Sequence, residues 1–226
     1  MSIADNRGSQ GDSNAPAVVA GALAVLVAGA LTVGVTEVGP LSRQMAIHIA
    51  AMNIVAPLLA ASSRPTDRAR AMLRRGLWPA TVVQLAVLWA SHSPAVHHAA
   101  HASLLSAILL HGILFLSALA FWFSITSAET SRWQPMLALI VSGKFACLLG
   151  VLLIFAPRPL FEPHAAHVGQ AAHSALMADQ HLAGLLMIAA CPLSYVLTAV
   201  ILAVRAVTHL EKRSAFIEAS APLAGR

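Results

Sequence analysis

The sequence predicts an all-α protein, a polytopic membrane helical bundle of about six transmembrane helices with both termini in the cytoplasm. Three observations lead to this fold class: an apolar composition, six long apolar segments, and an uneven distribution of basic residues. Hydrophobic residues make up 58% of the chain, charged residues only 10%, and the mean hydropathy is +0.75. Because a soluble domain carries about 25% charged residues, this chain lacks the polar side chains that a water-exposed surface requires.

Six segments are long enough to cross the hydrocarbon core, which takes about 20 residues of helix. These expected spans cover residues 16–36, 42–62, 76–92, 103–126, 135–157 and 180–205. All six are expected to be helices, because backbone polar groups inside a bilayer must be hydrogen-bonded within the protein. The bundle then occupies residues 15–208, between a disordered cytoplasmic tail at 1–14 and a cytoplasmic C-terminal tail at 209–226.

The basic residues give the expected orientation of this bundle. Eleven of the fourteen Lys and Arg residues fall in the two tails or near the ends of the second, fourth and sixth spans. Only Arg43 and Arg158 lie on the other side, and Lys144 falls within the fifth span. Because cytoplasmic loops carry the excess of Lys and Arg, both termini are expected in the cytoplasm. The chain is expected to be a multi-pass protein of the bacterial inner membrane.

With this orientation, ten of the eleven histidines face the periplasm or lie in the periplasmic half of a span. Those in or beside the periplasmic connections include His97, His98, His101 and His181. Two others, His48 and His111, lie about two turns inside the second and fourth spans. Ionisable side chains inside a membrane usually face the bundle interior and mark a function. His48 and His111 are therefore candidate functional residues.

The second span carries a pattern typical of soft metal ligands. Met45, His48 and Met52 are spaced i, i+3 and i+7, which places two thioethers and an imidazole on one helical face. Such ligands suit Cu(I), so these residues and His111 are candidate copper ligands. The alternative is ordinary packing, because methionine often fills irregular gaps in a core.

The histidines before the fourth span allow two interpretations. His97 and His111 are fourteen residues apart, so on one continuous helix they would be only about 40° out of phase. With His101 beside this stripe, a longer fourth helix would carry imidazoles from the periplasm into the membrane. The alternative is a solvated loop in which His97, His98 and His101 bind metal ions weakly.

Three residues at or within the last two spans carry further expectations. Asp179 and His181 lie where the sixth span enters the membrane, and Asp179 is expected either to cap that helix or to join His181 as a metal ligand. Lys144 lies too deep to bring its ammonium group fully to the surface. It therefore needs a partner or a water-filled cavity.

The sequence lacks the motifs of several enzyme classes: a G-x-S-x-G elbow, a GxGxxG turn, a P-loop and H-E-x-x-H. It also lacks a pair of acids within the spans for general acid–base catalysis. Cys147 and Cys191 lie in separate apolar segments, so neither a disulfide framework nor a zinc site is expected. A non-enzymatic protein is expected.

Two stretches resemble a known family. QMAIHIAAMNIVAPLLA at residues 44–60 is similar to a pattern like HMxxHMxxxxxAPLL, and DQHLAGLLM at residues 179–187 is similar to DQxxxGLLM. With weaker matches at 111–122 and 148–161, the chain resembles the CtaG family of multi-span membrane cytochrome c oxidase assembly factors, the kind required for the caa-type oxidase. The residues that match the family's motif positions are Met45, His48, Ala56, Pro57, Leu58, Leu59, His111, Asp179, Gln180 and Gly184. Two positions depart from the motif: Gln44 replaces its first histidine and Ile49 a methionine.

The resemblance implies an assembly factor that supports copper delivery or insertion from the periplasmic side by transient Cu(I) binding. Its implied partners are subunits of a haem–copper cytochrome c oxidase. Three alternatives remain: an accessory oxidase subunit that handles no metal, a copper or proton-coupled transporter that uses Lys144, His48 and His111, and a haem protein with paired histidine ligands. No nucleic-acid partner is expected, because the basic residues lie in short loops beside apolar segments.

The expected topology can be tested with reporter fusions. A reporter fused after Arg226 should be cytoplasmic, and one inserted near His167 should be periplasmic, because the basic loops lie on the cytoplasmic side. A cytoplasmic result at His167 would show that the number of spans or the orientation is wrong.

Overall fold

The computed structural model describes residues 21, 38–63, 65–128, 133–161 and 169–220. Every regular element in these ranges is a helix, which confirms the all-α expectation. In chain order they are α2 (Pro40–Ala50), the π-helical turn η1 (Ala51–Val55), α3 (Ala56–Ser62), α4 (Asp67–Arg75), α5 (Leu77–Ser91), α6 (Pro94–His101), α7 (Leu104–Ser127), α8 (Gln134–Phe155) and α9 (Gln170–Ser220).

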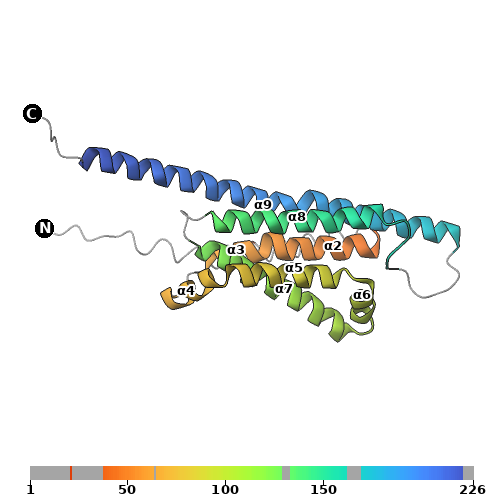
Figure 1. The fold of residues 1–226 in the computed structure, drawn as a ribbon. Helices are drawn as coiled ribbons and strands as arrows, with labels where there is room; N and C mark the ends of the chain where they lie inside the picture. The colour runs from red at the N-terminus through yellow and green to blue at the C-terminus, as the bar shows by residue number, and fades with distance from the viewer. Residues whose placement is uncertain (1–20, 22–37, 64, 129–132, 162–168, 221–226) are drawn as a thin grey trace, which may run out of the picture.

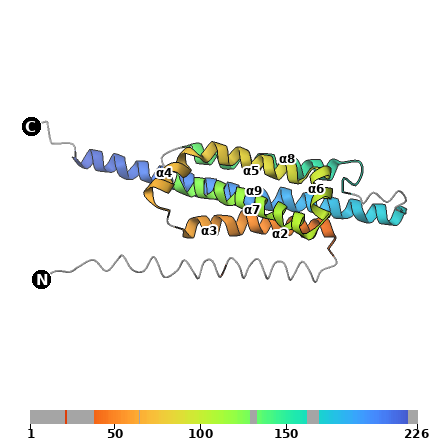
Figure 2. The same ribbon diagram turned by 90° about the horizontal axis from the view of Figure 1, so that it is seen from below.

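The long helices run side by side in an elongated bundle (Figure 1). α9 packs on α8 and on α2, and α5 packs on both α7 and α8. α9 is the longest helix and extends past the rest of the bundle in both directions (Figure 1). The short helices α4 and α6 lie at opposite ends (Figure 2). We call these the arginine end, after the four arginines of α4, and the histidine end, after the three histidines of α6.

Four helical stretches are long and apolar enough to cross a membrane: Pro40–Ser62, Leu104–Ser127, Gln134–Phe155 and Gln170–Ser214. They correspond to the second, fourth, fifth and sixth expected spans. The third corresponds to α5, whose 15 residues fall short of the roughly 20 needed to span. The expected tail at 1–14, the expected span at 16–36 and His167 lie outside the described residues. Six spans and cytoplasmic termini therefore stay predictions.

The π-helical turn in the first long stretch accommodates Pro57. Within η1 the backbone hydrogen bonds join residues that are five apart, since the N–H of Ala56 donates to the carbonyl of Ala51. The next bond in this register would join residue 57 to Met52, but proline has no N–H to donate. The carbonyl of Met52 instead accepts the indole N–H of Trp122 on α7 at 2.8 Å. This bond satisfies the orphaned carbonyl and joins the first long stretch to α7.

Trp122 also connects α7 to the two helices beside it. Its ring is 1% exposed and stacks parallel on Tyr195 of α9, with 5.6 Å between the ring centroids. The hydroxyl of Tyr195 is in turn 2.7 Å from the side-chain nitrogen of Gln84 on α5. Stacked rings with a satisfied polar end pack well in an apolar interior. These contacts hold α5, α7 and α9 together at the middle of the bundle.

Two glycines allow α8 and α9 to approach closely. A Cβ atom on Gly150 would lie 2.9 Å from the carbonyl oxygen of Gly184, and one on Gly184 would lie 2.8 Å from that of Gly150. Small residues are typical of such contacts between membrane helices, because they let the backbones touch. A side chain at either position would push α8 and α9 apart.

Replacement of Trp122 by Phe should destabilise the bundle by about 1–3 kcal/mol, because a buried carbonyl loses its hydrogen-bond donor while most of the ring packing remains. Thermal unfolding in detergent would measure this loss. Trp133→Phe is the matched control, because Trp133 is 64% exposed. Equal unfolding temperatures for the two variants would contradict the proposed role of the indole N–H.

Candidate functional site

Three imidazoles from three parts of the bundle meet near the histidine end. His48 lies on α2, His92 directly follows α5, and His111 lies on α7. The ring centroid of His48 is 5.5 Å from that of His92 and 6.0 Å from that of His111. His48 and His92 are buried, and His111 is half-buried. We call these three residues the imidazole cluster.

A thioether borders the imidazole cluster. The sulfur of Met45 lies 3.2 Å from Nε2 of His92, and the side chain of Met45 is 2% exposed. Met52 is also buried in the hydrophobic core, where its carbonyl is bonded to Trp122. The structure therefore brings Met45, His48 and His111 to one place, and shows Met52 as a core residue bonded to α7.

The backbone orients two of the three rings. Nδ1 of His92 lies 2.7 Å from the carbonyl of Leu88, and Nδ1 of His111 lies 2.7 Å from that of Ala107. A carbonyl oxygen can only accept, so each Nδ1 carries the proton. In the neutral rings Nε2 is then left with a lone pair. Histidines that bind metals are commonly oriented in this way by a hydrogen bond from the other ring nitrogen.

His48 is held differently from its two neighbours. Both of its ring nitrogens are buried, and neither has a hydrogen-bond partner in the part of the chain that the structure describes. A buried polar group without a partner costs about 1–3 kcal/mol, so its presence calls for an explanation. A ligand bound to His48 would provide one, and the ring can rotate toward it without breaking a hydrogen bond.

The imidazole cluster is not a closed metal site. Within the described residues, no three His, Cys, Asp or Glu side chains form a group that could hold a metal ion as they stand. Two imidazoles that share one ion at about 2 Å have ring centroids about 5–6 Å apart. The centroid distances around His48, 5.5 and 6.0 Å, fall in this range. Imidazole and thioether donors without a carboxylate are suited to a soft ion.

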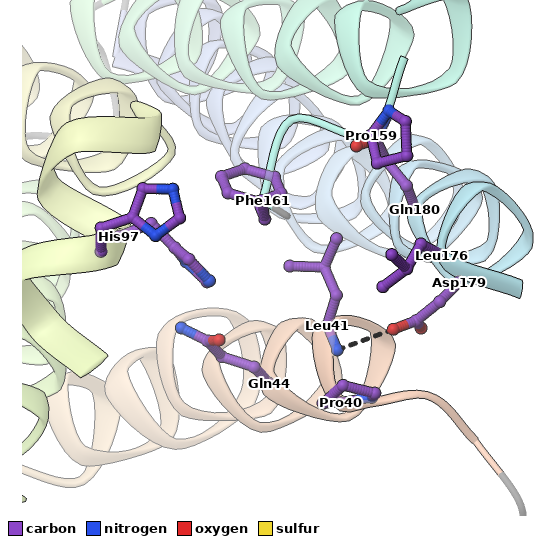
Figure 3. Close-up of a pocket in the computed structure, with 10 residues that line it drawn as sticks. Pro40, Leu41, Gln44, His97, Pro159, Phe161, Leu176, Asp179 and Gln180 are labelled. Atoms are coloured by element: carbon purple, nitrogen blue, oxygen red, sulfur yellow. Dashed lines mark hydrogen bonds between the residues drawn. The ribbon is translucent and has the colours of Figure 1, made fainter. Parts of the chain in front are cut away.

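A pocket of about 280 Å³ opens at the histidine end. It is lined by Pro40, Leu41, Gln44, His97, His98, Pro159, Phe161, Leu176, Asp179 and Gln180 (Figure 3). His97 is buried, and its ring centroid lies 4.4 Å from that of Phe161. Gln44, which replaces a motif histidine, therefore lies in the same pocket as two histidines of α6.

The two interpretations of the stretch from His97 to His111 are both wrong. The stretch forms two separate helices, because Ser103 is extended (φ −154°, ψ 157°) and its hydroxyl caps α7 in a reciprocal pair with Ser106. The continuous ladder of imidazoles is therefore broken. The solvated loop is also absent, because Pro94–His101 is the helix α6, with His97 buried against Phe161.

Asp179 caps a different helix from the one expected. α9 begins at Gln170, nine residues before Asp179, so the expectation that Asp179 starts its own helix is wrong. Its carboxylate instead accepts the backbone N–H groups of Leu41 and Ser42 at 2.9 and 3.0 Å, at the start of α2 (Figure 3). A Cβ atom on Gly39 would overlap this carboxylate, which explains the glycine.

Gln180, the next residue, bonds to the end of α8, the other helix that packs on α9 here. Its side-chain oxygen accepts the N–H of Leu160 at 2.7 Å, and its side-chain nitrogen donates to the carbonyl of Leu153 at 3.0 Å. These bonds satisfy backbone groups at the end of α8, where the helix leaves carbonyls without partners. Asp179 and Gln180 thus form a clamp that joins α2 and α8 to α9. His181 follows on α9 and is half-buried.

The sequence pattern does not single out His92 of the imidazole cluster. This residue ends an apolar segment and lies next to the histidines of the connection that follows. Its depth depends on where α5 ends, and its neighbours come from helices distant in sequence. Lys144, in contrast, is exposed on α8 and does not join His48 and His111.

A comparison with protein families gives a match over most of the chain. The family model described as cytochrome c oxidase caa3 assembly factor (Caa3_CtaG) matches residues 14–209. This match covers most of the chain, including the imidazole cluster and the clamp. Comparisons with curated proteins and with solved structures gave no match.

Asp179→Ala should lower the free energy of unfolding by about 0.5–2 kcal/mol, because α2 loses its cap. Gly39→Ala should cause a similar loss, and the double variant should lose less than the sum, because both changes break one contact. Gly112→Ala is the control, since a Cβ there meets no atom within 4 Å. Thermal unfolding and Cu(I) titration would measure the effects. Loss of copper binding without loss of stability would instead make Asp179 a ligand.

Proposed function

The chain belongs to the family of cytochrome c oxidase caa3 assembly factors, and from this premise we propose that it supports copper delivery by binding Cu(I) transiently at the imidazole cluster. The observation that carries this proposal is His48, whose two ring nitrogens are buried between His92 and His111 and have no hydrogen-bond partner among the described residues. A site of this kind would bind copper as cargo and pass it on, which requires no catalysis.

The donor set favours Cu(I) over the other common metal ions. Three imidazoles and the Met45 thioether include no thiolate or carboxylate, which Zn²⁺ commonly recruits beside imidazole. Soft thioether ligands select Cu(I). The absence of thiolate from this set also favours release, because the cargo must leave for the oxidase. Cys191, the buried thiol, lies on α9 next to Asn53 at the middle of the bundle.

The helix that carries His48 also lines the pocket at the histidine end. His48 lies eight residues after Pro40, so it is about 12 Å along α2 from the end of the bundle at 1.5 Å per residue. His97, His98 and Gln44 line the pocket at that end. We propose that the pocket admits copper and that this end faces the periplasm, as the basic loops of the opposite end suggest.

Partners follow from the same proposal. The protein would act in the bacterial inner membrane beside subunits of a haem–copper oxidase, from the side on which copper is inserted. An accessory role without metal handling would place the same chain beside the same partner. Metal binding by the imidazole cluster distinguishes the two roles.

His48→Ala, His92→Ala and His111→Ala should each weaken Cu(I) binding by about 10–100-fold or more, because each removes a donor from one shared site. A double variant of His48 and His111 should bind little worse than either single variant. Equilibrium competition with a Cu(I) chelator would measure the affinities of the purified protein. Oxidase activity in cells should fall in the same variants and recover in part with added copper.

His209→Ala is the matched control, because this histidine is exposed near the far end of α9. Wild-type affinity in all three cluster variants would reject the site. If affinity instead fell only in His97→Ala and His98→Ala, the pocket rather than the imidazole cluster would bind copper. Oxidase activity that depends on the chain while no variant changes copper binding would favour the accessory role.

A further inference from the structure

Lys144 is a charged residue that the imidazole cluster does not use. It is the eleventh of the 22 residues of α8, so it lies about 15 Å from either end of this spanning helix at 1.5 Å per residue. Its side chain is exposed on the outside of the bundle, and within the described residues it has no hydrogen-bond or ion-pair partner. A lysine stem is too short to carry its ammonium group from this depth to the membrane surface.

The surface around Lys144 is apolar. Ile140 and Leu148, one turn to either side, are exposed on the same stripe of α8. Beside this stripe an open groove of about 320 Å³ runs between α5 and α8. It is lined by Val82, Leu85, Ala86, Trp89 and Phe145. A side chain that fills this groove would lie next to α8 at the level of Lys144, because Phe145 is the neighbouring residue.

The ring of Trp89 forms part of the groove wall on α5. It packs edge-on against Phe145 of α8 with 6.3 Å between centroids. Its Nε1 is buried, so this N–H is not accessible to a docked molecule. The ammonium group of Lys144 is exposed beside the groove, and its positive charge calls for a negative acceptor.

Among the residues that the structure describes, no carboxylate lies at the depth of Lys144. None of its nine Asp and Glu residues falls within any of the six expected spans. Asp179 lies near the histidine end and is bonded to the start of α2, and Glu211 lies near the far end of α9. A second copy of the chain would bring the same residues at the same depths. Within the described residues nothing supplies a counter-charge for Lys144, and a different molecule can supply it.

We propose that Lys144 and the groove between α5 and α8 form a docking surface for a transmembrane helix of an oxidase subunit that carries an Asp or Glu near the middle of the membrane. This inference rests on the proposed role in oxidase assembly and names the surface through which the partner is held. The carboxylate pairs with the ammonium group, and apolar side chains on either side of it fill the groove. Docking of this kind leaves the histidine end of the bundle uncovered.

The experiment is co-purification of oxidase subunits with the tagged, full-length chain from membranes in mild detergent. Lys144→Met keeps the length of the side chain and removes its charge, so it should recover about tenfold less of the oxidase. Lys144→Arg should retain it. Lys212→Met is the matched control, because it removes the same charge from an exposed position outside the expected spans. All three variants should bind Cu(I) with wild-type affinity.

Charge reversal makes the test specific for a carboxylate. Lys144→Glu should lose the oxidase, and a change of one Asp or Glu to Lys in a spanning helix of an oxidase subunit should restore it. Wild-type recovery with Lys144→Met would overturn the proposal. The proposal would also be overturned if Lys144→Met lost only self-association, which would indicate that a second copy binds there. Loss of only bound anionic lipid would overturn it too, and would indicate a lipid phosphate. Loss of copper binding in His48→Ala with normal co-purification would leave this inference standing.

Discussion

The clamp formed by Asp179 and Gln180 determines how the helices at the histidine end are placed. These adjacent residues point in different directions from α9, and each satisfies backbone groups that a helix end would otherwise leave without partners. One holds the start of α2 and the other holds the end of α8. Because His48 follows two turns after the capped start of α2, its position depends on a carboxylate from the last helix. The Gly150–Gly184 contact then fixes the distance between α8 and α9.

The imidazole cluster combines rigid and free side chains. Backbone carbonyls of their own helices hold the rings of His92 and His111, whereas within the described residues the ring of His48 makes no hydrogen bond. The three rings therefore differ in how they are held, although all three are imidazoles. Two are oriented by the backbone, and the third is positioned by packing alone.

Much of the fold could be predicted from the sequence, because helix length and hydropathy are local properties. Four apolar stretches were located to within a few residues, apart from α9, which runs well past the expected span at both ends. The sequence does not predict α6 as a separate helix, because its separation from α7 depends on the capping pair of Ser103 and Ser106. The site was predicted only in part. Intramembrane depth singled out His48 and His111, but contacts between distant helices, such as that of His92 with Met45, leave no spacing in the sequence.

The cap on α2 has a consequence for the order in which the protein is made. α2 leaves the ribosome long before α9, so its first N–H groups have no carboxylate to bind until the last helix has entered the membrane. During that interval the first turn of α2 lacks this cap and is free to fray. The start of α2 is therefore completed only after the last helix has been made.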